Sequence, residues 1–179
     1  MTQVGNVYGE ALYDLARSEN LDSQILAEIT ALKESFIQEP DFLRLMAAPN
    51  VPKEERCQIL DSSFREKVHP YVLNFLKILT EKGYIREFDR CCKVFRDRYN
   101  QDNGILAVTA VTAVPLKEEL REKLLEKLSQ VTGKHIDLSC RVDPDTLGGV
   151  RLDFDGMQVD GTVRRRLDDI RSILRSTVL

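Results

Sequence analysis

The C-terminal stretch from Ile136 to Leu174 constrains the fold more than any other part of this 179-residue chain. Apolar residues occupy every second position in two segments, 136–142 and 150–154, which is the period of a half-buried β-strand. The residues expected to face inward from the first strand are Ile136, Leu138, Cys140 and Val142. Asp155-Gly156 can supply the positive φ angles of a type I′ turn, so we predict that the second strand folds back on Met157–Val159 as a hairpin.

A helical period follows the hairpin. The apolar residues then recur at i, i+4, i+7 and i+11, on one face of a closing helix formed by Val163, Leu167, Ile170 and Leu174. We interpret the glycines of this block, Gly148, Gly149 and Gly161, as backbone devices that bend the chain and do not bind a ligand. Thr162 is placed to cap the closing helix.

This block resembles the C-terminal signature of the ATP synthase delta subunit family, whose mitochondrial member is the oligomycin-sensitivity-conferring protein. The resemblance rests on Gly148-Gly149-Val150, on the exposed hairpin, and on the segment that contains Asp160, Gly161, Arg164 and Arg166. Chain length, a helical first half and the segment Tyr8–Ala16 are also similar to that family. Thr162 stands where the family often has serine, a conservative change for a helix cap.

Composition supports a globular chain and excludes several functions. Hydrophobic residues make up 42% of the sequence, enough to bury a sizeable core. The formal net charge of −3 offers no basic excess for binding nucleic acid through its phosphates. No apolar run approaches the roughly 20 residues of a membrane span, and no signal peptide pattern follows Met1. We expect an intracellular, soluble chain.

The first helix has an unusually wide apolar sector, which covers about 180° between Val4 and Ala16. Gly5 and Gly9 lie inside this sector, where missing side chains let another backbone approach closely. The sector is either a docking surface for a partner or a face that packs on a second helix of the same domain. The residues alone leave both open.

Five further helices are predicted before residue 100. The second begins at Asp22 as its N-cap, the third at Pro40, the fourth at Lys53 and the fifth at Pro70. In the fourth helix, the residues expected to face inward are Cys57, Leu60 and Phe64. The fifth helix is apolar on nearly all sides, so it is either central to the bundle or covered by a partner. The sixth carries Phe88, Cys92, Phe95 and Tyr99 on one face.

A turn-rich segment, 100–104, separates this helical part from a β-branched strand at 105–114. A helix follows, and its inner face is expected to contain Leu116, Leu120, Leu124, Leu128 and Val131. The predicted fold class is therefore α+β overall: an N-terminal six-helix bundle, residues 1–104, and a small α+β domain, residues 105–179, in the order strand, helix, strand, hairpin, helix.

We find no catalytic or metal-binding pattern. Leu147-Gly148-Gly149 lacks the lysine and hydroxyl residue of a phosphate loop. A calcium loop around Asp153 would place Arg151 at the first ligand position and Thr162 at the twelfth, and Thr162 cannot bind calcium through two carboxylate oxygens. The four cysteines form no C-x-x-C pair, and we interpret them as small buried hydrophobes. His69 and His135 have no neighbouring ligand pattern. We therefore expect a chain that is not an enzyme by itself and has no cofactor and no metal.

The cluster Arg164-Arg165-Arg166 is the one unusual charge feature. Three cations in the first turn of a helix oppose the positive end of its dipole unless an anion compensates. The cluster is either a solvated face paired with nearby aspartates or a contact for an acidic protein partner. An alternative function is a nucleic-acid-binding module that uses these arginines, although the balanced charge argues against it.

The family resemblance implies a peripheral-stalk subunit that couples proton transport to ATP synthesis. It implies that the helical domain binds the N-terminal helices of the alpha subunits, with beta subunits as further candidates, and that the C-terminal domain binds the membrane-anchored b-type stalk subunits. The location implied is peripheral, on the cytoplasmic or stromal face of an energy-transducing membrane, with neither membrane insertion nor nucleic acid. The groove for an alpha helix would consist of Tyr8, Ala11, Leu12, Leu15, Phe75, Ile78 and Leu79. The signature residues that bind a partner or shape the domain would be Gly148, Gly149, Asp160, Gly161, Arg164 and Arg166.

Overall fold

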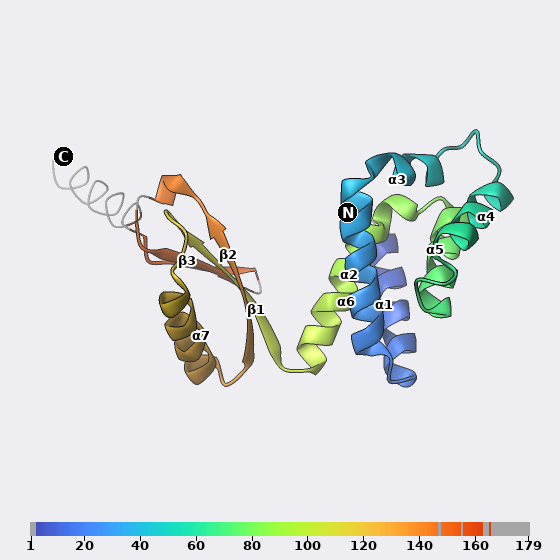
Figure 1. The fold of residues 1–179 in the computed structure, drawn as a ribbon. Coiled ribbons are helices and arrows are strands. Elements are labelled where there is room, and N and C mark those ends of the chain that lie inside the picture. The colour runs from blue at the N-terminus through green and yellow to red at the C-terminus, as the bar shows by residue number, and fades with distance from the viewer. Residues whose placement is uncertain (1–2, 147, 155, 163–164, 166–179) are drawn as a thin grey trace, which may run out of the picture. The chain divides into compact units, whose positions relative to one another are not determined.

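The structure is a computed structural model that describes residues 3–146, 148–154, 156–162 and 165. The chain divides into two compact units, 1–99 and 100–179, and each is considered by itself (Figure 1). The division falls inside the last turn of a helix that ends at Asp102. In the described residues, the first unit consists of helices, and the second contains a four-stranded sheet and the helix that packs on it. The broad prediction of a mixed α and β chain is confirmed.

The N-terminal unit is built from helices that are joined by short turns (Figure 1). These elements are α1 (Gln3–Ser18), α2 (Asp22–Gln38), α3 (Pro40–Met46), α4 (Lys53–Phe64), α5 (Pro70–Lys82), the 3-10 helix η1 (Ile85–Glu87) and α6 (Phe88–Asp102).

Local sequence signals set most of the helix ends. Pro40 and Pro70 occupy the first turns of their helices, where a missing N–H costs no hydrogen bond. Gly83 ends α5 with a φ of 77°, a conformation that costs glycine little. The prediction of Asp22 as an N-cap is wrong, because Leu21 holds that position and makes no side-chain cap. The Asp22 carboxylate instead accepts a hydrogen bond from Arg17 at 3.0 Å.

An aromatic cluster lies at the centre of the N-terminal core. Phe36 of α2 contacts the rings of Phe42, Phe64 and Phe88, with centroids 5.3 to 6.1 Å apart, so that one side chain joins four elements. A second pair, Tyr13 and Phe95, joins α1 to α6 in an edge-on contact at 5.2 Å. The predicted inward residue Leu60 is fully buried, whereas Cys57 of α4 is only half-buried.

The two glycines of α1 allow it to pack closely on α6. A Cβ atom at Gly9 would lie 2.8 Å from the carbonyl oxygen of Cys91 and 2.9 Å from Cβ of Val94. A Cβ at Gly5 would lie 2.6 Å from Cγ of Arg90. The glycine part of the wide apolar sector therefore faces a helix of the same unit, which decides this part of the open question against a docking surface.

The C-terminal unit is a mixed sheet with strand order β2-β1-β3-β4. Its elements are β1 (Ile105–Thr112), α7 (Glu118–Thr132), β2 (His135–Val142), the 3-10 helix η2 (Pro144–Thr146), β3 (Val150–Phe154) and β4 (Met157–Asp160). β1 pairs in parallel with β2 and antiparallel with β3, and the predicted β3–β4 hairpin is confirmed. The predicted closing helix lies outside the described residues, except for Arg165, which is helical.

The core of this unit lies between α7 and one face of the sheet. Leu124, Leu125 and Leu128 of α7 pack on a cluster that includes Leu106, Val108, Ile136 and Leu138. Two residues that we expected on the inner face of α7 are exposed instead: Leu120 is 51% exposed and Val131 is 83% exposed. Their positions on the helical wheel lie to one side of the stripe that faces the sheet.

The end of β2 also differs from the prediction. Ile136 and Leu138 are buried, but Cys140 is exposed and Val142 is 46% exposed, although both follow the same alternation. The alternation correctly assigns the face of the sheet, but α7 does not cover the whole of that face. Of the four cysteines, Cys91 and Cys92 are buried as expected, and burial raises the pKa of each thiol to about 12.

The bend between η2 and β3 depends on two glycines with positive φ, 151° at Gly148 and 83° at Gly149. A Cβ at Gly149 would lie 2.7 Å from the carbonyl oxygen of Gly161 and 3.0 Å from Cα of Thr162. The Gly161 N–H in turn donates to the carbonyl of Val150 at 3.1 Å. Two distant parts of the signature therefore touch through their backbones, as expected for residues that shape the unit.

Replacing Gly9 by alanine should destabilise the N-terminal unit, although alanine is normally favoured in a helix by about 1 kcal/mol. The new methyl group would collide with backbone atoms of α6, and such overpacking costs about 1–3 kcal/mol before α1 shifts away. Ala27→Gly on the exposed side of α2 is the control, because it measures the difference in helix propensity by itself. Urea unfolding in which Gly9→Ala is as stable as the unmodified chain, or more stable, would contradict the close contact at Gly9.

Replacing Gly149 by aspartate should destabilise the C-terminal unit by more than the same change at Gly156. Both glycines have positive φ, which costs other residues about 1–2 kcal/mol, but a Cβ at Gly156 would meet nothing within 4 Å. The difference between the two variants therefore isolates the contact with Gly161. Thermal unfolding measures it, and identical midpoints would show that this contact does not constrain the fold.

Candidate partner-binding surfaces

The predicted groove residues divide into buried and accessible groups. Leu12, Phe75 and Leu79 are 5%, 7% and 0% exposed and belong to the hydrophobic core of the N-terminal unit. A partner cannot reach these three side chains while the unit remains folded. Ala11, Leu15 and Ile78 are exposed, and Tyr8 is half-buried. The structure thus brings all seven residues to α1 and α5, but only four of them reach the surface.

The exposed residues of α1 form a straight ridge. Val7, Ala11 and Leu15 are spaced four residues apart, and Val7 and Leu15 are 61% and 41% exposed. The position of this ridge follows from the packing of α1, since Gly5, Gly9 and Ala16 face inward on the opposite side. Two acidic residues border the ridge on one side: Glu10 and Asp14 lie next to Val7 on the helical wheel, on the side away from Leu15.

Tyr84, which the sequence did not suggest as a site residue, connects α1 to the end of α5. Its ring lies 6.1 Å from the ring of Tyr8 and is 39% exposed. Two backbone hydrogen bonds fix its position. The N–H of Gly83 donates to the carbonyl of Thr80, and the N–H of Tyr84 donates to the carbonyl of Leu79, which is the pattern of a Schellman motif. In that motif the residue directly after the glycine usually makes an apolar contact with the helix. The pair Gly83-Tyr84 could therefore have indicated from the sequence that Tyr84 lies against the end of α5.

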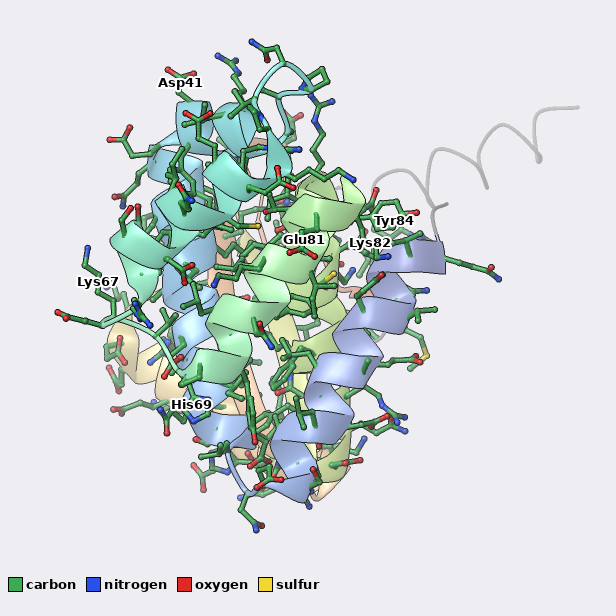
Figure 2. The ribbon with its side chains drawn as sticks, turned by 90° about the vertical axis from the view of Figure 1, so that its right-hand side faces the viewer. Asp41, Lys67, His69, Glu81, Lys82 and Tyr84 are labelled. Atoms are coloured by element: carbon green, nitrogen blue, oxygen red, sulfur yellow. The ribbon has the colours of Figure 1, made fainter. Side chains whose placement is uncertain are left out.

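We call Val7, Ala11, Leu15, Ile78 and Tyr84 the apolar strip. Figure 2 views the N-terminal unit with α5 in front, and Tyr84 lies near α1 with the charged Glu81 and Lys82 close by. Four of the six large exposed apolar side chains of residues 3–99 belong to this strip; the other two are Ile37 and Leu45. Exposed apolar surface in this unit is therefore concentrated on α1, on the C-terminal half of α5 and on the turn that follows α5.

The signature residues of the C-terminal unit mostly bind one another. The Asp160 carboxylate accepts a hydrogen bond from the N–H of Thr162 at 2.9 Å, and hydrogen bonds with the Thr162 side chain and with this N–H lower the pKa of Asp160. The Thr162 hydroxyl accepts a hydrogen bond from the N–H of Arg165 at 3.2 Å, as expected of a helix cap. Gly148, Gly149 and Gly161 form the adjoining bend. Arg164 and Arg166 lie outside the described residues.

The described residues offer neither a metal-binding cluster nor a membrane span. No three histidine, cysteine, aspartate or glutamate side chains in this part of the chain come together as metal ligands. No helix among the same residues is long and apolar enough to cross a membrane. The surfaces that remain for function are the apolar strip and the exposed parts of the C-terminal unit.

Comparisons with known proteins identify the chain over nearly its whole length. The family model described as ATP synthase delta (OSCP) subunit matches residues 4–174. The protein named ATP synthase subunit delta from Clostridioides difficile is 28% identical over 98% of this chain and 97% of its own length. The protein of that name from Alkaliphilus oremlandii is 33% identical over 92% of this chain and 91% of its own.

A solved structure has a similar fold. One chain of the Toxoplasma gondii mitochondrial ATP synthase hexamer superposes with a TM-score of 0.78, covering 97% of this chain and 98% of its own, at 17% sequence identity. The resemblance predicted from the signature residues is therefore confirmed. The chain belongs to the ATP synthase delta (OSCP) subunit family and is a structural, non-catalytic subunit of the peripheral stalk of F-type ATP synthase.

Proposed function

We propose that the two units of this stalk subunit bind different partners. The N-terminal helical bundle, residues 1–104, would bind the N-terminal helices of the alpha subunits, with the beta subunits as further candidates. The C-terminal α+β domain, residues 105–179, would bind the distal end of the b-type stalk subunits. The subunit would then act on the cytoplasmic or stromal face of the membrane, as a link that keeps the catalytic head from turning with the rotor.

The apolar strip is the observation that carries this proposal. The core of the N-terminal unit is complete without it, since Leu12, Phe75 and Leu79 are already buried. An exposed ridge of this kind costs solubility unless a partner covers it. Its members on α1 span about 12 Å along the helix axis, which matches two turns of a partner helix lying alongside.

The shape of the strip favours a helix over an extended segment as the partner. Ala11 lies between the larger Val7 and Leu15, so it leaves a shallow depression in the ridge where a partner side chain can insert. Tyr8 and Tyr84 border the depression on the side of α5 with aromatic rings, which are frequent anchors at interfaces. Glu10 on the other side would favour a basic residue along the edge of the partner helix, whereas Asp14 already pairs with Arg98 at 3.8 Å.

The task of a stalk link agrees with such contacts. Holding the head against rotation requires contacts that dissociate slowly, and residence time depends mostly on well-packed apolar anchors. It requires no bond chemistry. The alternative of a nucleic-acid-binding module gains no support from the relatives, and the net charge of −3 gives no electrostatic basis for it.

Replacing Ala11 by arginine should weaken binding of an alpha N-terminal peptide by at least about 2 kcal/mol, the size of an interface hot spot. The long charged side chain would fill the depression in the strip and prevent close approach of a helix. Ile37→Arg is the matched control, because Ile37 is 68% exposed on α2 and lies outside the strip. Calorimetry measures both affinities, and circular dichroism checks that both variants fold. Equal affinities would remove the strip as the binding site.

If the two units bind different partners, one variant should lose only binding to the b-type subunit and another only binding to the alpha subunit. Gly149→Asp, which distorts the bend of the C-terminal unit, should abolish capture by a b-type C-terminal fragment and leave alpha peptide binding within about twofold. Ala11→Arg should show the reverse pattern. In membranes, Gly149→Asp should leave ATP hydrolysis but reduce proton pumping, because the head is no longer held. A variant that loses both partners together would contradict independent binding sites.

A further inference from the structure

The strand β2 lies at one edge of the C-terminal sheet, and its outer side pairs with no strand of the described residues. It is eight residues long, and its register with β1 runs without a bulge from His135 to Val142. Proteins usually protect a free edge with a short strand, a proline or a bulge, because an unpaired edge is a template for another chain. β2 has none of these three features. Its charged side chains are Asp137 and Arg141, which have opposite signs.

The hydrogen bonds to β1 show which backbone groups of β2 point outward. The N–H of His135 donates to the carbonyl of Gly104 at 3.1 Å, and the N–H of Asp143 donates to the carbonyl of Thr112 at 2.8 Å. Because these groups alternate in direction along a strand, the odd-numbered residues bond to β1 and the even-numbered residues point away from the sheet. The outward residues are Ile136, Leu138, Cys140 and Val142. Their N–H and C=O groups form a regular row that a second strand can bind.

The charges of β2 are complementary to themselves about Ser139. When two copies of the strand run antiparallel with Ser139 opposite Ser139, Asp137 of each copy lies opposite Arg141 of the other. Both side chains are exposed, and no ion pair among the described residues includes either of them. A twofold axis at Leu138 would instead place Asp137 opposite Ser139 and form no such pair. Charge therefore selects the register centred on Ser139.

The backbone and the apolar residues agree with the same register. Leu138 then lies opposite Cys140, and Ile136 lies opposite Val142. All four are outward residues, so each pair exchanges two hydrogen bonds in an antiparallel ladder. Within one chain Cys140 is exposed and Val142 is 46% exposed, whereas Ile136 and Leu138 are buried. The pairing thus gives each exposed apolar residue an apolar neighbour on the second chain.

We propose that this edge is a dimerisation surface, at which β2 of one copy of the chain pairs antiparallel with β2 of a second copy about a twofold axis at Ser139. The two sheets would then form one continuous sheet. Both copies use the same surface, so association ends at two chains. The opposite edge, β4, is only four residues long and is less suited to pairing. The proposal uses neither the apolar strip nor a stalk partner and does not rest on the proposed function.

The first test reverses charges on the edge of the full chain and measures its mass by sedimentation. The unmodified chain should be a dimer. Asp137→Arg and Arg141→Asp should each weaken it at least about tenfold, because each change creates two pairs of like charges. An equimolar mixture of the two variants should dimerise again, because the two arginines of one chain then face the two aspartates of the other. Asp97→Arg, the same change at an exposed residue of α6, is the control and should remain dimeric.

A monomeric unmodified chain would overturn the proposal. Charge-reversed variants that dimerise as well as the unmodified chain, or a mixture of them that stays monomeric, would also overturn it. Ala11→Arg provides a further control, because it changes the apolar strip and leaves β2 intact. A dimer that is lost in Ala11→Arg and kept in Asp137→Arg would place the contact on the apolar strip and contradict the role of β2.

The second test measures proximity in a chain whose Cys57 and Cys140 are replaced by serine. The Ser139 side chain lies on the face away from α7, where its hydroxyl oxygen is 3.0 Å from that of Thr109. In the proposed dimer the two Ser139 Cα atoms are about 4.5 Å apart, a separation that a disulfide can span. Ser139→Cys should therefore form a disulfide between chains under mild oxidation. His135→Cys should not, because its two copies lie about 27 Å apart along the paired strands. No disulfide at position 139, or equal amounts in both variants, would overturn the proposal.

Discussion

The close contact between α1 and α6 controls what the N-terminal unit presents to a partner. Gly9 brings the backbone of α1 against the carbonyl of Cys91, and this contact leaves no room for another residue. Because side chains on a helix are fixed relative to one another, the contact also fixes the rotation of α1 about its axis. Leu12 and Ala16 then enter the core, and the ridge that contains Ala11 faces solvent on the opposite side. One backbone contact thus sets the position of the apolar strip.

A close backbone contact at a glycine also shapes the C-terminal unit. Gly149 and Gly161 lie far apart in the sequence, yet their backbones are too close for a Cβ at Gly149. This contact joins the bend before β3 to the turn after β4, and the adjoining hydrogen bonds of Asp160 and Thr162 complete the corner. The Asp160 carboxylate and the Thr162 hydroxyl are therefore used within the unit. We propose that these two residues contribute to partner binding by holding the shape of the domain.

Periodic apolar patterns and local turn signals together allowed much of the fold to be predicted from the sequence. The helix starts at Pro40 and Pro70, the helix end at Gly83 and the hairpin after Phe154 follow from local backbone preferences, which act within a few residues. The seven-residue groove was predicted less well. An apolar pattern shows that Leu12 and Ala11 share a broad sector, but it does not show which of them the neighbouring helices cover. That distinction depends on tertiary contacts such as the one at Gly9.

The exposed end of β2 and the exposed side of α7 have the same physical origin as the error in the groove. The alternation through Cys140 and Val142 and the spacing of Leu120 and Val131 predicted burial, but all four residues are exposed. The patterns identified apolar faces and not what covers them. Burial also requires an element that lies on top of the face. In the N-terminal unit most of the exposed large apolar residues belong to the strip, which we propose as the binding site for an alpha subunit.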